Sequence, residues 1–161
     1  MSAKPNNNLA RMIQLAEEFF AVKNDPSQIS INKKVMLRLH KIHPSTMTEK
    51  RTSRGPIAWI LLIPTTHALM DQFIAKEINE RELFHKTPVR VKYDSIYLCS
   101  ALVLPEYRGK GLAKRLMMKA IKSMQKEHPV NCLFSWAFSE EGKKLAASVA
   151  RELSLRLYNR V

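Results

Sequence analysis

Apolar residues recur at three- and four-residue spacing in several segments of the chain, and this spacing predicts amphipathic helices. The predicted helices cover residues 7–22, 32–42, 67–84, 111–126 and 140–157. Other runs are almost continuously apolar and predict buried strands over residues 57–63, 94–104 and 131–138. The stretch 45–55 is polar and basic and predicts a loop.

The second half of the chain alternates strand, helix, strand and helix. This order is typical of a βαβ unit, in which a helix joins two parallel strands by a right-handed crossover. The chain has 161 residues, of which 45% are hydrophobic, and this is enough for one domain with a sizeable core. We therefore expect a single α/β domain over residues 1–161.

Charge is the compositional feature that most restricts the partners. The chain carries 27 Lys and Arg against 14 Asp and Glu, a net charge of +13. Such a field attracts polyanions, namely nucleic acid, anionic lipid, an acidic carrier protein or a phosphorylated cofactor, without choosing among them. The longest apolar run, residues 57–63, is too short to cross a bilayer, and the N-terminus lacks the apolar core of a signal peptide. We expect a cytoplasmic protein with no membrane insertion, in which Cys99 and Cys132 are reduced thiols.

One stretch, ALVLPEYRGKGLAKRL at residues 101–116, holds two of the four glycines between a strand and a basic helix. Glycines let the backbone turn tightly, and the N–H groups of a helix N-terminus attract phosphate. The dinucleotide-binding fingerprint needs a further glycine where Lys114 stands, and the P-loop needs Ser or Thr after Gly-Lys. Both patterns fail, and a plain strand-to-helix turn stays open as the alternative.

The pattern that fits is Arg-x-x-Gly-x-Ala, formed by Arg108, Gly111 and Ala113 after the Val103-Leu104-Pro105 end of a strand. It closely resembles the acyl-CoA-binding motif of the GNAT N-acetyltransferase superfamily, and the resemblance covers roughly residues 92–155. It implies an α/β fold with a mixed central sheet flanked by helices. Relative to that family, we expect a helix at about 67–84 before the central strand, and a shortened C-terminus.

The resemblance also implies how an acyl-CoA would bind. Backbone amides of Arg108, Gly109, Lys110, Gly111, Leu112 and Ala113 would hold the pyrophosphate. Leu102, Val103 and Leu104 would pair with the pantetheine arm like an added strand, and an amide near Leu104 would polarise the thioester. Lys143 or Lys144 would reach the adenosine end. The acceptor amine would attack directly, and no metal is expected.

The proton path is open at this stage. Many members of the superfamily have a tyrosine in the last helix that protonates the departing thiolate, but that position is Ala150 here. Ser148, Tyr107, Cys99 or water could substitute, and a thiolate can also leave without a dedicated acid.

Asp94 and Tyr97 are the candidate bases on the central strand. Glu77, Glu80 and Glu82 are expected on a solvated helix face, and His67 and His85 at the surface.

Two further expectations concern His43 and the end of the chain. His40 and His43 have no companion ligands in the sequence, so a metal site is not expected there. Few residues follow the last helix, so the strand 131–138 is expected at the edge of the sheet, covered by a homodimer partner or by the N-terminal helices.

Three functions are compatible with these observations. The first is an N-acyltransferase that uses acetyl-CoA and a primary amine. The second is a related transferase that takes longer acyl groups from CoA or from an acidic acyl carrier protein. The third is a non-catalytic module that binds CoA or RNA. Against RNA, the basic residues are scattered and no aromatic platform is present.

Overall fold

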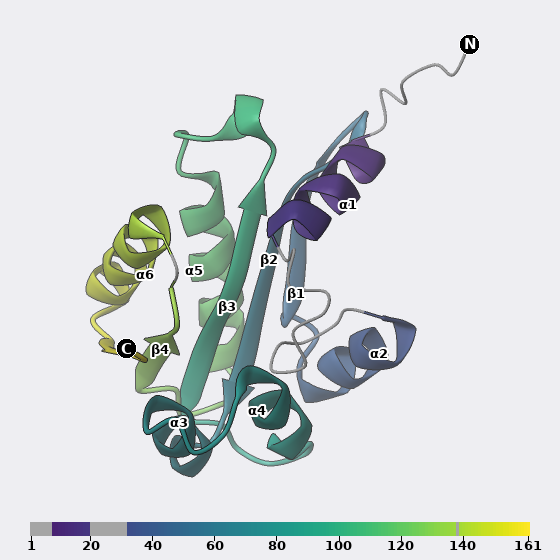
Figure 1. Ribbon diagram of the computed structural model, residues 1–161. Helices are drawn as coiled ribbons and strands as arrows, with labels where there is room; N and C mark the ends of the chain where they lie inside the picture. The colour runs from purple at the N-terminus through teal and green to yellow at the C-terminus, as the bar shows by residue number, and fades with distance from the viewer. Residues whose placement is uncertain (1–7, 20–31, 138) are drawn as a thin grey trace.

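The computed structural model describes residues 8–19, 32–137 and 139–161, and one five-stranded sheet in the order β1-β2-β3-β4-β5 organises them (Figure 1). The strands are β1 (Met47–Thr52), β2 (Gly55–Thr65), β3 (Ser95–Val103), β4 (Cys132–Ser135) and β5 (Arg156–Asn159). The first three strands pair antiparallel, and β3, β4 and β5 pair parallel. The mixed sheet and the predicted βαβ unit are therefore confirmed.

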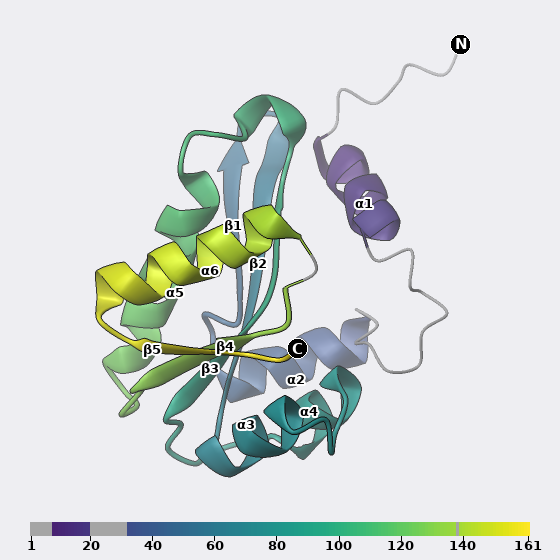
Figure 2. The same ribbon diagram turned by 60° about the vertical axis from the view of Figure 1, so that its left-hand side comes forward.

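Helices cover both faces of this sheet (Figures 1 and 2). They are α1 (Asn8–Phe19), α2 (Lys33–Ile42), α3 (His67–Ile74), α4 (Glu80–Lys86), α5 (Leu112–Gln125) and α6 (Glu140–Leu153), with a 3₁₀ turn η1 (Pro105–Tyr107). One face packs against α5 and α6, and the other against α1 to α4. None of the helices in the described part of the chain has the length and apolarity needed to cross a membrane.

The sheet has a hydrophobic core on each of its faces, because successive side chains of a strand point to opposite faces. In β2, Ile60 and Leu62 pack with α5 and α6, whereas Leu61 and Ile63 pack with α2, α3 and α4. A strand that is buried on both faces has a nearly continuous apolar sequence, and the apolar run at residues 57–63 predicts β2 for this reason.

The predicted loop over residues 45–55 is wrong. It forms β1 and a hairpin turn into β2, with Gly55 at φ +111°. Glu49, Lys50 and Arg51 are exposed on this edge strand. Charged side chains protect an edge strand from unwanted pairing with other chains. Because β1 is charged, the pattern of apolar residues did not predict it.

The single helix predicted over residues 67–84 is two short helices, α3 and α4. Lys76 has φ +65°, outside the helical region, so the first helix stops before it. Asn79 then starts α4 with a capping box, in which its side chain accepts from the Glu82 N–H and Glu82 accepts from the Asn79 N–H. His67 and His85 are exposed, as expected.

The strand at residues 131–138 was expected at the sheet edge, and this prediction is wrong. The chain continues after α6 into β5, which pairs parallel with β4 from Cys132 to Ser135. Ser154 has φ +55° at the C-terminal end of α6, and this left-handed residue turns the chain back to the sheet. The reason for expecting a homodimer at this edge therefore no longer holds.

Candidate functional site

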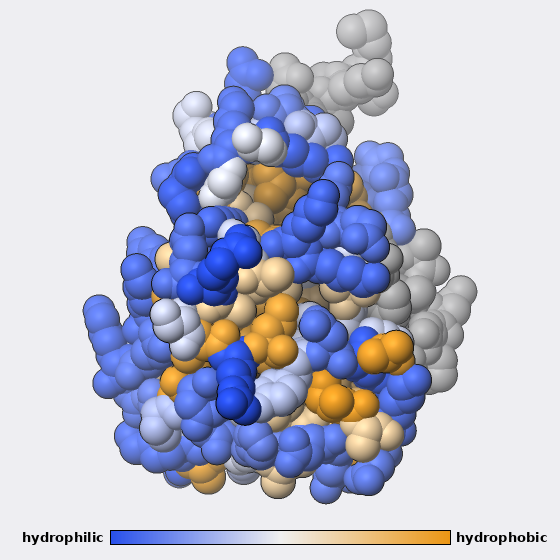
Figure 3. All heavy atoms as spheres, turned by 90° about the vertical axis from the view of Figure 1, so that its left-hand side faces the viewer, coloured by the Kyte–Doolittle hydropathy of each residue, from blue (hydrophilic) through white to orange (hydrophobic). Residues whose placement is uncertain are grey.

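A cavity of about 810 Å³ opens beside the carboxyl half of β3. Its walls come from β3, the loop between η1 and α5, the start of α6 and the turn after β4. Figure 3 faces the side that carries α5 and α6 and shows an apolar hollow below the upper end, framed by hydrophilic side chains. Apolar walls with a few polar groups are typical of sites for small organic ligands.

The cavity exists because β3 and β4 separate. They pair only from Ser95 to Leu98, opposite Cys132 to Ser135, whereas β3 stays paired with β2 as far as Val103. In the described part of the chain, no strand pairs with residues 99–103 on the β4 side. Figure 2 shows β4 lying at a wide angle to the upper part of β3. This open edge can pair with an extended ligand.

A β-bulge lies at the point of separation. Leu61 pairs with Ser100 and Leu62 with Leu98, so Cys99 has no partner in β2. A bulge bends its strand and increases the local twist, and bulges are frequent next to active sites. The bulge therefore turns the end of β3 away from β4.

The loop before α5 forms the upper end of the cavity. Gly109 has φ +78° and Gly111, the N-cap of α5, has φ +73°. The side chain of Arg108 ties this loop to the strand, because its Nε donates to the carbonyl of Val103 at 2.9 Å. The first turn of α5 has no acidic residue, so its N–H groups and dipole are available for an anion.

Most of the residues expected to bind CoA line this cavity. They are Leu102, Val103, Arg108, Gly109, Gly111, Leu112 and Ala113. Leu104 does not, and its N–H donates to the Ile57 carbonyl at 2.9 Å, so this amide is committed to the sheet. Lys110 and Lys143 are exposed outside the lining, and Lys143 pairs with Glu140 at 3.3 Å.

A carboxylate lies at the other end of the cavity. Glu80 is only 7% exposed, and its Oε1 accepts hydrogen bonds from the Tyr97 hydroxyl at 2.8 Å and from the Cys99 thiol at 3.4 Å. Burial raises the pKa of Tyr97 well above its usual value, and the neighbouring Cys99 and Glu80 act in the same direction. Burial likewise raises the pKa of the Cys99 thiol, with Glu80 adding to the shift. Both groups therefore stay protonated and donate to the carboxylate.

The expectation that Glu80 lies on a solvated helix face is wrong. Glu77 and Glu82 are exposed, as expected, but the break before α4 changes the direction of the helix. The Asn79 capping box was readable as Asn-x-x-Glu and is the signal that could have located this helix start. Starting at Asn79, α4 buries Glu80 against β3.

Arg160 reaches the same region from the end of the chain. Its guanidinium lies over the ring of Trp136 at 4.5 Å and over that of Phe73 at 4.6 Å, and it donates to the Ile78 carbonyl at 3.0 Å. Its charge favours the ionised form of Tyr97 and so opposes the rise in the pKa of that phenol. No motif in the sequence pointed to Trp136 or Arg160.

Two other predicted catalytic residues, Asp94 and Ser148, lie apart from the cavity lining. Asp94 precedes β3 at its amino end, where its carboxylate accepts from Ser95 Oγ at 3.1 Å. Ser148 is on α6 outside the lining, and Ala150 is buried in the core. Tyr107 lines the cavity near the loop.

His43 has companions that its sequence neighbourhood does not show. Ligand atoms of His43, Glu127 and His128 lie within 4.8 Å of one another, a spacing that could hold a metal ion. However, the Nδ1 atoms of His43 and His128 accept backbone N–H groups of Ser45 and Tyr93 at 3.0 and 3.2 Å. Each neutral ring then carries its proton on Nε2 and offers a donor there, which a metal does not bind.

Comparison with known proteins gives the same family as the motif. The sequence profile of the acetyltransferase (GNAT) family matches residues 15–160. No curated protein matches the sequence.

The solved structures that match this chain are similar to it at low sequence identity. Naa20 of Chaetomium thermophilum, solved with a bisubstrate analogue, is 13% identical with a TM-score of 0.52, over 88% of this chain and 64% of that one. An aminoglycoside acetyltransferase from an uncultured soil metagenomic sample, solved with sisomicin, is 14% identical with a TM-score of 0.49, over 88% and 78%. A ribosomal-protein-alanine N-acetyltransferase from Brucella melitensis biovar Abortus 2308 is 14% identical with a TM-score of 0.44, over 88% and 80%.

This chain thus spans less than two thirds of the Naa20 chain, and at 13% identity the likeness to Naa20 shows the fold alone. The profile match is broader evidence, since it extends from α1 to the end of β5. This protein belongs to the acetyltransferase (GNAT) family.

Proposed function

We propose that this protein transfers an acyl group, in the first instance acetyl, from CoA to a primary amine. One observation carries the proposal. A single cavity joins the glycine loop before α5, the open edge of β3 and the carboxylate of Glu80. These are an anion site, a strand edge and a proton acceptor, in the order that an acyl-CoA and an attacking amine require.

The donor is assigned to the loop end. Backbone N–H groups between Arg108 and Ala113 hold the pyrophosphate, and the open edge at Leu102 and Val103 pairs with the pantetheine arm. CoA carries about four negative charges near neutral pH, which suits a protein of net charge +13. Because the Leu104 amide is committed to the sheet, the hydrogen bond to the thioester oxygen falls to an amide of residues 99–101.

The acceptor chemistry is assigned to Glu80. A primary amine is protonated near neutral pH and must lose a proton before it can attack. Glu80 takes that proton, directly or through one water, while Tyr97 and Cys99 hold the carboxylate in place by donating to it. The neutral amine attacks the thioester carbonyl and forms the N–C bond, and its nitrogen then loses a second proton to water. The C–S bond breaks, and the thiolate leaves with the sulfur electron pair. Tyr107 or water then protonates the thiolate.

A thiol-release assay with acetyl-CoA tests the proposal against a panel of amines, polyamines, amino acids and peptides. We expect turnover with at least one acceptor and firm binding of acetyl-CoA by calorimetry. Firm binding without turnover on any acceptor would instead support a CoA-binding module.

A longer acyl donor is the second candidate. The apolar lining at Leu98, Met117 and Leu145 could receive an acyl chain, and the positive charge suits an acidic acyl carrier protein. Acyl-CoAs of increasing chain length and carrier-bound acyl groups, compared in the same assay, separate the two donors by their kcat/KM.

A further inference from the structure

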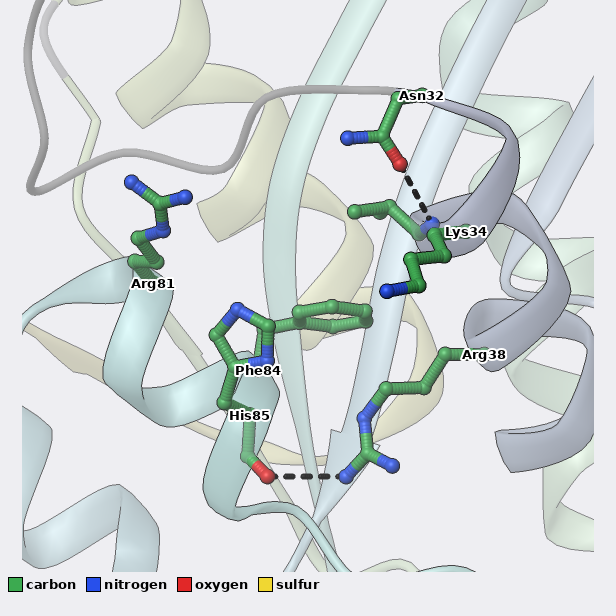
Figure 4. A pocket seen from close by; sticks show the side chains of 7 residues that line it. Asn32, Lys34, Arg38, Arg81, Phe84 and His85 are labelled. Atoms are coloured by element: carbon green, nitrogen blue, oxygen red, sulfur yellow. Dashed lines mark hydrogen bonds between the residues drawn. The ribbon is translucent and has the colours of Figure 1, made fainter.

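A second cavity, of about 440 Å³, lies between α2 and α4. Figure 4 shows Lys34 and Arg38 extending from α2 toward Phe84 and His85, with Arg81 across the opening. Among the described residues that line it, none is acidic. A concave surface lined by charges of one sign focuses the field and concentrates ions of the opposite sign.

Arg38 is held rigidly at the floor of this cavity. Its Nη2 donates to the carbonyls of His85 at 2.9 Å and Thr87 at 2.6 Å, and its guanidinium lies 5.6 Å from the centre of the Phe84 ring. Its Nε is buried and has no hydrogen-bond partner among the described residues. A buried donor without an acceptor is costly, and an anion in the cavity would relieve that cost.

Two carboxylates of α4, those of Glu80 and Glu82, have other hydrogen-bond partners. Glu80, next to Arg81, faces the acyl cavity and accepts from Tyr97. Glu82 is used by the capping box, where it accepts from the Asn79 N–H at 3.1 Å. Three basic side chains, Lys34, Arg38 and Arg81, therefore share one concavity whose described lining contains no carboxylate.

The two cavities adjoin the same turn of α4. Glu80 lines the acyl cavity and Arg81, the next residue of α4, lines the basic one. Consecutive helix residues point about 100° apart and a helix with its side chains is about 10 Å across, so Glu80 and Arg81 can reach groups of one ligand up to about 10 Å apart.

We propose that the basic cavity binds an oxyanion, a carboxylate or a phosphate, carried by the acyl acceptor. This inference rests on the proposed function, because it places the amine of that acceptor at Glu80. The acceptor is then an amine with an anionic group about 10 Å away. Phe84 and Val35 in the lining of the basic cavity provide apolar surface for the part of the acceptor that carries the anionic group.

Direct binding is the first test. With acetyl-CoA at saturation, inorganic phosphate and succinate are titrated while amide NMR shifts of α2 and α4 are followed. The double variant Lys34→Gln/Arg81→Gln removes two exposed cations of the lining, and Lys86→Gln removes an exposed cation of α4 outside it. We expect at least about tenfold weaker binding in the double variant and less than about twofold in Lys86→Gln. Equal losses in both variants, or no binding to the wild type, would overturn the site.

Turnover is the second test, with aminooctanoate and aminohexyl phosphate compared with octylamine as acceptors. We expect a lower KM for the anionic amines, and we expect that advantage to disappear in Lys34→Gln/Arg81→Gln while the KM for octylamine stays unchanged. The anionic amine with the larger decrease in KM relative to octylamine shows whether the cavity prefers a carboxylate or a phosphate. Equal KM values for charged and uncharged amines would refute the acceptor assignment. A wild type that binds the ions but acylates no amine would count against the proposed function instead.

Discussion

The two ends of the acyl cavity are built from different parts of the chain. The loop end offers backbone groups, namely the N–H groups before α5 and the free edge of β3. The opposite end offers side chains, with Glu80 held by Tyr97 and Cys99. A backbone site depends on where the chain runs and tolerates most side-chain changes. A side-chain site can be lost through one conservative substitution.

The largest expected effect tests the side-chain end. Glu80→Gln keeps the size of the group but cannot accept a proton, so we expect kcat to fall by about 10²–10⁴-fold. The Kd for acetyl-CoA, measured by calorimetry, should stay within about twofold, since the loop end is untouched. Glu77→Gln, an exposed neighbour, is the matched control and should leave both kcat and the Kd for acetyl-CoA unchanged. Full activity in Glu80→Gln would remove this carboxylate from the proton path.

The next effect tests the backbone end through a pair of variants that differ by one charge. Asn and Asp both tolerate positive φ and have nearly the same size, so Gly111→Asn and Gly111→Asp add similar bulk beside Arg115. We expect Gly111→Asp to bind acetyl-CoA at least about tenfold more weakly than Gly111→Asn, because its carboxylate repels the pyrophosphate. Gly55→Ala, at a positive φ in the distant hairpin, controls for backbone strain. Equal affinities of the two Gly111 variants would place the pyrophosphate elsewhere.

A smaller expected effect tests whether Tyr97 only positions Glu80 or also takes part in the proton transfer. Tyr97→Phe removes the hydroxyl that donates to Glu80 and leaves the ring packed between Phe73 and Phe134. We expect kcat to fall by about tenfold, less than in Glu80→Gln, with unchanged affinity for acetyl-CoA. A loss equal to that of Glu80→Gln would mean that the phenol itself takes part in the proton transfer.

The smallest expected effect is on the pH dependence of stability, and it concerns His43, which lies outside the acyl cavity. Burial lowers the pKa of His43, so below about pH 6.5 the unfolded chain binds a proton that the folded protein does not. Stability should therefore fall as the pH drops through and below that value. In His43→Asn, the amide oxygen can still accept from the Ser45 N–H, and the loss of Tm between about pH 7.5 and 5.5 should be smaller than in the wild type. An unchanged slope would assign the acid sensitivity to other groups, of which His128 is the first.

The same difference between backbone and side chains explains what the sequence could predict. The glycine loop and the strand before it are local features, so Arg108, Gly111 and Ala113 were enough to find that end. The other end joins Glu80 and Tyr97 with Trp136 and Arg160, which are brought together only by the completed sheet. The direction of Glu80 also depends on where α4 begins, and an apolar pattern does not mark such a boundary.

Two other features escaped prediction for related reasons. The strand β1 is an exposed edge, so the face that would have marked it as a strand is polar. His43 and His128 meet although 85 residues separate them, and nothing in either local sequence indicates the other.

The bulge at Cys99 makes the path of β3 depend on the number of residues in the strand. Before it, Tyr97 points to the α4 side of the sheet and Leu98 to the α5 side. After it, Ala101 packs on the α5 side and Leu102 against α1, so the odd-even order of the strand is reversed. Removing Cys99 would restore a regular strand with Ala101 and Leu102 on the faces they occupy now, but it would also remove the bend that separates β3 from β4. The shape of the acyl cavity is therefore set by a residue count, and a deletion there would do more harm than most substitutions of the same side chain.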